Sequence, residues 1–117
     1  MSNPTYTGEE REKTAIWLGG AIKTPPFSKV ARFEAGMLLR RLQKGEVLSM
    51  PHSKPMAAIG PRCHELRITD ETMRWRIIYR VDADVILVAE IFSKRTRKTP
   101  KNVIKTCRRR LRGYDNG

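Results

Sequence analysis

Arginine and glutamate side chains recur on one predicted face of two short strands within residues 63–81. Alternation with a period of two places Glu65 and Arg67 together on the first strand, and Arg76 and Arg80 together on the second. A guanidinium stays charged at physiological pH and can bind two phosphate oxygens at once. The pattern therefore predicts a cationic, phosphate-facing surface with one carboxylate in it as a candidate proton acceptor.

Three strands are predicted to form that surface, at residues 63–68, 75–82 and 85–92. Short acidic turns between them make neighbouring strands antiparallel. The third strand is almost entirely apolar, so it is expected at the centre of the sheet, covered on both faces. The alternation that places Glu65 on the cationic face sends His64 toward the opposite, core-facing side.

Two helices and one further strand complete the predicted domain. A strand at residues 14–22 precedes a helix that is capped by Ser28 and stopped by Gly45. Thr99 is expected to cap a last helix that begins at Pro100. The buried stripes of the two helices are expected to be Ala31, Ala35, Leu38 and Leu42 in the first and Val103, Cys107 and Leu111 in the second.

The order of these elements is typical of a small α+β domain, with a mostly antiparallel sheet of about four strands and both helices packed on one sheet face. Residues 1–13 are interpreted as a flexible leader and residues 14–117 as a single domain. Residues 45–61 contain several prolines and glycines and are predicted to be an irregular connection.

The balance of charge favours a polyanionic partner. The chain of 117 residues has 24 lysines and arginines against 12 aspartates and glutamates, a net charge of +12. Such an excess attracts nucleic acid or an acidic protein. The start of the chain is polar and no long apolar stretch follows, so no membrane association is expected.

Neither the cysteines nor the histidines of the chain predict a metal site. The two cysteines, at positions 63 and 107, form no Cys-x-x-Cys pair and no disulfide framework, so a reducing cytoplasm is expected. The two histidines, at positions 52 and 64, lie apart from any ligand-spaced partner. We therefore expect no metal and no cofactor.

Three motifs occur in order along the second half of the chain: His-Glu-Leu-Arg at 64–67, Trp-Arg-Ile-Ile-Tyr at 75–79 and Phe-Ser-Lys-Arg-Thr-Arg-Lys-Thr-Pro at 92–100. With the Leu-Arg-Arg-Leu-Gln-Lys-Gly run that ends at Gly45, they resemble the phage-derived Gp49-like branch of the RelE/HigB toxin superfamily. The similarity spans about residues 16–111 and implies a small RelE-like fold.

This resemblance implies a toxin of a type II toxin–antitoxin system. Such a toxin is a metal-independent endoribonuclease that cleaves messenger RNA, typically on the ribosome, and so inhibits translation. Its partner would be a small antitoxin, either helical or with a helix-turn-helix fold. Arg76 matches the arginine of the middle strand in RelE-type nucleases, and Arg95 matches the arginine at their Lys-Arg strand end. Both positions contact phosphate in that family.

The proton-transfer groups are not carried over, because the lysine pair and the tyrosine of RelE itself have no counterpart here. Cleavage through the 2′-hydroxyl needs a base, for which Glu65 is the first candidate and His64 the second. The alternative for Glu65 is an ion pair with Arg67 or Arg76, and for His64 a place in the core or at a sheet edge.

Further cations are candidates for RNA or phosphate contact; these are Arg67, Arg80, Lys94, Arg97, Lys98 and Lys54. The alternative is that they are solvated charges that keep the sheet edge from aggregating. Trp17, Trp75 and Tyr79 alternate with apolar neighbours and are predicted in the core, not as base-stacking platforms. A second function class also fits the sequence: a binding protein on the same fold, either an inhibitor of DNA gyrase or a phage factor that binds RNA or protein.

Overall fold

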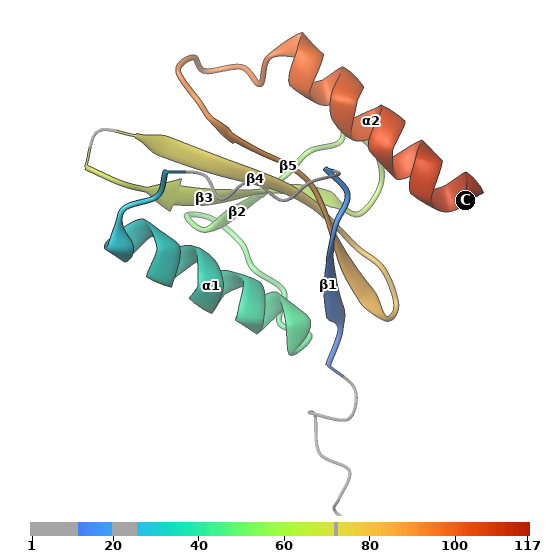
Figure 1. Cartoon of the computed structure of the whole chain (residues 1–117), viewed down its shortest axis with the longest axis horizontal. Coiled ribbons are helices and arrows are strands. Elements are labelled where there is room, and N and C mark those ends of the chain that lie inside the picture. The colour runs from blue at the N-terminus through green and yellow to red at the C-terminus, as the bar shows by residue number, and fades with distance from the viewer. Residues whose placement is uncertain (1–11, 20–25, 72) are drawn as a thin grey trace, which may run out of the picture.

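A five-stranded mixed sheet lies between two helices in the computed structural model, which describes residues 12–19, 26–71 and 73–117 (Figure 1). The strands lie side by side in the order β1-β5-β4-β3-β2. The strands are β1 (Thr14–Trp17), β2 (Ser53–Pro55), β3 (Cys63–Thr69), β4 (Arg74–Val81) and β5 (Val85–Ser93), and the helices are α1 (Lys29–Gln43) and α2 (Lys101–Asn116). The predicted small α+β class is confirmed, with five strands instead of about four.

Helix α1 forms as the sequence predicts. The Ser28 hydroxyl caps it by accepting a hydrogen bond from the Ala31 backbone N–H at 3.1 Å. The helix ends at Gln43, and Gly45, just past the C-cap Lys44, has a φ of 92°, in the left-handed region that only glycine adopts at low cost. The predicted stripe is buried against one face of the sheet, where it meets the strand residues Leu66, Ile68, Trp75, Ile77, Tyr79, Ile86 and Val88. Trp75 and Tyr79 therefore lie in the core, as expected.

Helix α2 covers the opposite face, so the expectation that both helices share one face is wrong (Figure 1). The reason lies in β4 and β5, which carry apolar side chains on both faces. Ile78, Leu87 and Ala89 point away from α1 and would be exposed without a second layer. The predicted stripe of α2, which comprises Val103, Cys107 and Leu111, covers them.

The edges of the sheet differ most from the prediction. Strand β1 pairs in parallel with β5 and ends at Trp17, so the expected strand at 14–22 is shorter, and its last three positions lie outside the described residues. Strand β5 is therefore an interior strand, while β4 is the central one. Of the expected leader only residues 12 and 13 are described. There the Lys13 backbone N–H donates to the Gln43 carbonyl at 2.8 Å.

Strand β2 was not predicted, because it is short and Pro55 ends it. It pairs antiparallel with β3 as the edge strand, a position that tolerates proline. The buried hydroxyls of Ser53 and Tyr79 lie 2.5 Å apart and form a hydrogen bond that joins β2 to β4. This bond fixes the edge strand to the core.

A β-bulge in β5 changes which of its side chains point to the α2 side of the sheet. Tyr79 pairs with Val88 and Ile78 pairs with Glu90, so Ala89 is an extra residue. Leu87 points to the α2 side before the bulge, and Phe92 does so after it. The strand end that follows is thereby shifted by one residue relative to simple alternation.

None of the helices that the structure describes is long and apolar enough to cross a membrane.

Candidate functional site

A buried carboxylate surrounded by cations lies on the α2 side of the sheet, beside the first turn of α2. The Glu65 side chain on β3 has no solvent exposure. Its Oε1 lies 3.5 Å from Nε of Arg76 and 3.9 Å from Nη1 of Arg67, and its Oε2 lies 3.3 Å from Nζ of Lys94. We call these four residues the Glu65 cluster. Three positive charges around one negative charge leave the cluster net cationic.

Strand register brings the arginines to Glu65. Arg67 and Arg76 are directly paired between β3 and β4, and Glu65 pairs with Ile78. Side chains on one face of an antiparallel pair interact with their direct and diagonal neighbours. Arg76 is therefore the diagonal neighbour of Glu65, while Arg67 is two residues along the same strand.

The bulge in β5 brings Lys94 to the cluster instead of Arg95. Without the extra residue, alternation from Leu87 would place Arg95 on the α2 side and Lys94 on the α1 side. The backbone N–H of Lys94 donates to the Arg74 carbonyl at 2.8 Å, which continues the ladder of β4 and β5 by one residue. Arg95 is exposed and lies in the loop after the strand.

The start of α2 also contacts Glu65. The Thr99 hydroxyl donates to Oε2 of Glu65 at 3.4 Å. The expectation that Thr99 caps α2 is therefore wrong, because Pro100 occupies the N-cap and no side chain bonds the first turn. Its first turn holds no acidic residue, so the positive end of the helix dipole adds to the cationic field.

Two atoms of the cluster have unused hydrogen-bonding capacity. Within the described residues, Oε1 of Glu65 and Nε of Arg76 are buried and make no hydrogen bond. Nη1 of Arg76 donates to the Trp75 carbonyl at 3.0 Å, which fixes the orientation of the guanidinium. Burial lowers the pKa of Arg76, the charge of Glu65 opposes this, and Arg67 and Arg74 add to it. Because arginine starts from so high a pKa, Arg76 keeps its charge.

The remaining loop cations border the cluster. Lys54 pairs with Glu65 across β2 and β3, so it lies on the same face of the sheet at its edge, and it is exposed. The loop between β5 and α2 exposes Arg95, Arg97 and Lys98. These side chains extend the positive surface around the Glu65 cluster without taking part in its ion pairs.

The structure separates His64 from the cluster, on the opposite face of the sheet. Its ring stacks on Tyr79 with centroids 5.3 Å apart, and within the described residues its buried Nδ1 makes no hydrogen bond. Burial lowers the pKa of His64, which favours the neutral ring. A group bound at Glu65 is out of reach of His64, because the sheet lies between them.

Arg80 is also separate from the cluster, and its guanidinium is fully paired. It donates to both carboxylate oxygens of Asp82 at 2.9 Å and to both oxygens of Asp115 at 2.7 and 3.0 Å. Its hydrogen bonds hold the pKa of each aspartate below the ordinary value. Arg80 therefore joins β4 to the turn that follows it and to the last turn of α2.

Thr99 and Asp115 are the site and anchor residues that sequence reasoning missed. The place of Thr99 before a proline at the start of a helix is a sequence signal, but that signal predicts a helix cap and not a contact with Glu65. Asp115 lies 35 residues from Arg80 along the chain, so no local pattern predicts the pair. Within the described residues, no group of three or more His, Cys, Asp or Glu side chains is arranged to hold a metal ion.

The fold and the cluster define a small α+β domain with a cationic site beside its last helix. Residues 26–112 match the family of phage-derived Gp49-like proteins (DUF891). Because the match covers most of the chain, the protein belongs to this family. No curated protein and no solved structure matches the chain.

Proposed function

We propose that this protein is the toxin of a type II toxin–antitoxin system and that it is an endoribonuclease which cleaves messenger RNA at the Glu65 cluster, on the ribosome. The observation that carries the proposal is the buried carboxylate with Arg67, Arg76 and Lys94 around it. Membership of the Gp49-like family supports it, as does the resemblance of the three sequence motifs to RelE/HigB toxins.

In this proposal the scissile phosphate binds to the cations of the cluster. Among the residues that the structure describes, Nε of Arg76 makes no hydrogen bond, and the Trp75 carbonyl holds its guanidinium in place. A preorganised donor of this kind stabilises the charge that develops on the phosphate oxygens in the transition state. Arg67 is the most exposed of the three cations, with 29% of its side chain accessible, so it is the group that meets the RNA first.

The proton transfers then fall to the two other members of the cluster. Glu65 is its one carboxylate, and Oε1 has no hydrogen-bond partner within the described residues. We assign it the proton of the 2′-hydroxyl, whose oxygen attacks the phosphorus. Lys94 gives a proton to the departing 5′-oxygen, so the products are a 2′,3′-cyclic phosphate and a 5′-hydroxyl. Because Glu65 is fully buried, the side chains that cover it must move aside before the 2′-hydroxyl can reach it.

The outer face of α1, on the side of the sheet away from the Glu65 cluster, fits a docking segment of the antitoxin. Val30, Phe33 and Met37 lie at helical spacing and are 74%, 69% and 47% exposed. Arg40 and Arg41 follow them on the same helix. Each pairs with one glutamate at 2.9 Å, Glu12 or Glu46, and both side chains stay partly exposed, at 56% and 42%. A segment with an apolar stripe and acidic side chains complements both parts. Co-expression with the product of the adjacent small gene is expected to give a stable complex and to restore growth, and Phe33→Asp is expected to weaken that complex.

The proposed activity is tested by brief induction in bacteria. Amino-acid incorporation is expected to stop while DNA synthesis continues, and new 5′ ends are expected on messenger RNA. Immediate DNA damage with intact transcripts would contradict the nuclease and support a gyrase inhibitor. Growth without any new 5′ ends would support a binding protein without nuclease activity.

A further inference from the structure

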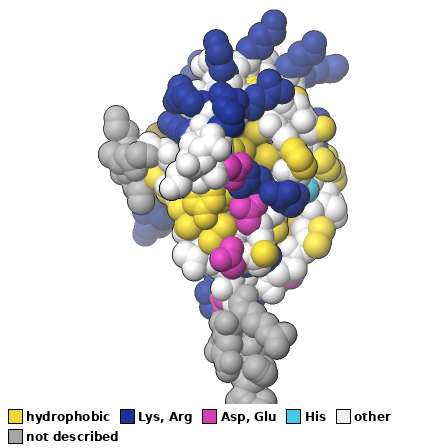
Figure 2. Space-filling model, turned by 90° about the vertical axis from the view of Figure 1, so that its right-hand side faces the viewer, with side chains coloured by type: hydrophobic (Ala, Val, Ile, Leu, Met, Phe, Trp, Pro, Cys, Tyr) yellow, Lys and Arg dark blue, Asp and Glu magenta, His cyan; other side chains and the backbone are white. Residues whose placement is uncertain are grey.

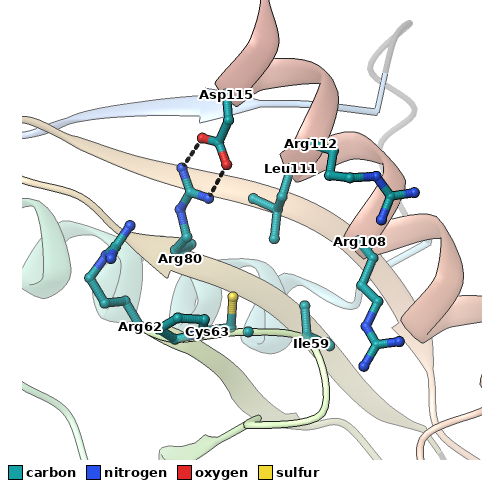
Figure 3. Close-up of a pocket in the computed structure, with 10 residues that line it drawn as sticks. Ile59, Arg62, Cys63, Arg80, Arg108, Leu111, Arg112 and Asp115 are labelled. Atoms are coloured by element: carbon teal, nitrogen blue, oxygen red, sulfur yellow. Dashed lines mark hydrogen bonds and ion pairs between the residues drawn. The ribbon is translucent and has the colours of Figure 1, made fainter.

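A second cationic feature, a pocket of about 480 Å³, lies on the α2 side of the sheet near the end of the last helix (Figure 3). Its lining includes Arg62, Arg80, Arg108, Arg112 and Asp115. Figure 3 shows Arg62 on one side of the pocket and Arg108 and Arg112 on the other. Figure 2 shows lysine and arginine side chains gathered over the top of the molecule, where α2 lies. We call this feature the arginine pocket.

The single carboxylate of the lining does not repel an anion, because its charge is already compensated. Asp115 makes two hydrogen bonds with Arg80, at 2.7 and 3.0 Å. Arg80 is therefore neutralised within the protein. Arg80 also pairs with Asp82, and Asp82 contacts Arg62 at 3.3 Å. Arg62 and Arg80 together therefore offset the two aspartates, and the pocket is left with the charges of Arg108 and Arg112.

Two of these arginines are held in place by backbone carbonyls. Nε of Arg62 donates to the Val81 carbonyl at 3.2 Å, and Arg108 donates to the carbonyl of Ala58. Fixing a guanidinium before binding reduces the entropy lost when an anion arrives. Arg112 is exposed and, within the described residues, makes no ion pair or hydrogen bond.

The backbone of Arg62 gives a second, independent indication. Its φ is 63°, in the left-handed region that a side chain with a Cβ rarely adopts. Strained residues of this kind cluster at binding and catalytic sites, where the surrounding structure holds them. Glycine or asparagine would suit this conformation better, and neither would place a guanidinium in the pocket.

We infer that the arginine pocket binds a phosphate group of the RNA chain, next to the segment held at the Glu65 cluster. This inference rests on the proposed function only for the identity of the polyanion. Arg76 and Arg80 are four residues apart on β4, which is about 13 Å at the rise of a strand. Both arginines lie on the α2 side of the sheet, so one RNA strand can contact the cluster and the pocket together.

Helix α2 offers a matched pair of variants for the test. Arg112 lines the pocket, whereas Arg109 is exposed on the same helix and does not line it. Arg112→Gln and Arg109→Gln make the same change of charge three residues apart. The binding of a labelled single-stranded 2′-O-methyl RNA is measured as a function of salt. This probe has no 2′-hydroxyl and cannot be cleaved, so the result does not depend on nuclease activity.

Arg112→Gln is expected to weaken binding about fivefold at 0.1 M salt and to reduce the salt slope by about 0.7, the loss of one phosphate contact on a single strand. Arg109→Gln is expected to change neither quantity as much. An equal loss in both variants would overturn the inference, because it would assign binding to the general charge of α2.

Inorganic phosphate and an acidic peptide are then tested as alternative anions, by measuring whether each raises the Tm of the protein. Suppose that phosphate or the peptide raises the Tm of the wild type but not that of Arg112→Gln, while both variants bind RNA equally well. The pocket then binds that anion and does not bind RNA. Thermal unfolding of both variants confirms that they are folded. A protein that binds RNA through Arg112 but never cleaves it would support the pocket and contradict the proposed nuclease.

Discussion

Two arginines on the central strand, four residues apart and on the same face, have opposite surroundings. Arg76 lies among other cations with one shared carboxylate, and within the described residues its Nε makes no hydrogen bond. Arg80 makes four hydrogen bonds to two carboxylates. The exposed fractions of the two side chains are nearly equal, at 6% and 9%. Burial does not distinguish them, whereas the balance of charge around them does.

This difference separates the proposed binding site from a structural contact. A buried charge that is fully paired is satisfied and has little left to offer a ligand. A buried cation with an unused donor in a cationic cluster favours an anion, which can accept the hydrogen bond and offset the excess positive charge. We therefore assign binding to the Glu65 cluster and anchoring of α2 to Arg80, although the sequence presents the two arginines alike.

The largest expected effect follows from removing the shared carboxylate. Glu65→Gln leaves Arg76 and Lys94 buried without their counter-charge, and breaking a buried pair from one side costs about 4 kcal/mol in the free energy of unfolding. Urea denaturation measures this loss. Because Glu65 is also the proposed base, cleavage is expected to fall in the fraction that remains folded. A variant as stable as the wild type would show that the carboxylate does not hold the cations.

Removal of the unused donor affects chemistry more than stability. Arg76→Ala is expected to raise the barrier to RNA cleavage by about 3 kcal/mol, which corresponds to the loss of one preorganised donor. Arg76→Lys is expected to recover little, since an ammonium cannot make the two-pronged contact. Cleavage rates of the purified variants on ribosomes give the measurement. Full activity in Arg76→Ala would remove this residue from the proposed mechanism.

The paired arginine shows the reverse pattern. Arg80→Gln removes charged hydrogen bonds to Asp82 and Asp115, and the expected loss in the free energy of unfolding is about 2 kcal/mol. Below the melting temperature and at saturating RNA, cleavage at the Glu65 cluster is expected to continue, although Asp115 then faces the arginine pocket without its partner and weakens RNA binding. A stable but inactive Arg80→Gln protein would contradict the division between the two arginines.

The smallest effect is the pH dependence of that anchor. Arg80 lowers the pKa of both Asp82 and Asp115 from the ordinary value of 3.8. The contribution of the aspartates to stability is therefore fully present above that value and is lost as the pH falls below it. The difference in Tm between wild type and Arg80→Gln is expected to shrink from about pH 6 to about pH 3. A difference in Tm that stays constant with pH would show that the pairing of Arg80 with the two aspartates does not stabilise the fold.

Local patterns predicted the helices and the long strands. The stripes of α1 and α2, the Ser28 cap and the Gly45 stop depend on neighbours a few residues apart, and all of them are confirmed. Two-residue alternation also placed Glu65, Arg67 and Arg76 on one face. The spacing of residue types along the chain is enough to predict these features.

Features that depend on distant pairing were not predictable. The parallel pairing of β1 with β5, the edge strand β2 and the position of α2 on the far face arise only when the chain has folded. The bulge at Ala89 has no sequence signal, yet it decides that Lys94 and not Arg95 reaches Glu65. The partner Asp115 is equally distant from Arg80 in sequence.

The most direct test of the central claim compares the two arginines of β4 in the same cell. Wild type, Arg76→Gln and Arg80→Gln are induced briefly at equal soluble levels, and new 5′ ends are mapped on messenger RNA. We predict new ends with wild type and with Arg80→Gln, and their loss with Arg76→Gln. New ends that persist with Arg76→Gln, or that depend on Arg80 instead, would contradict the assignment of the Glu65 cluster as the site of cleavage.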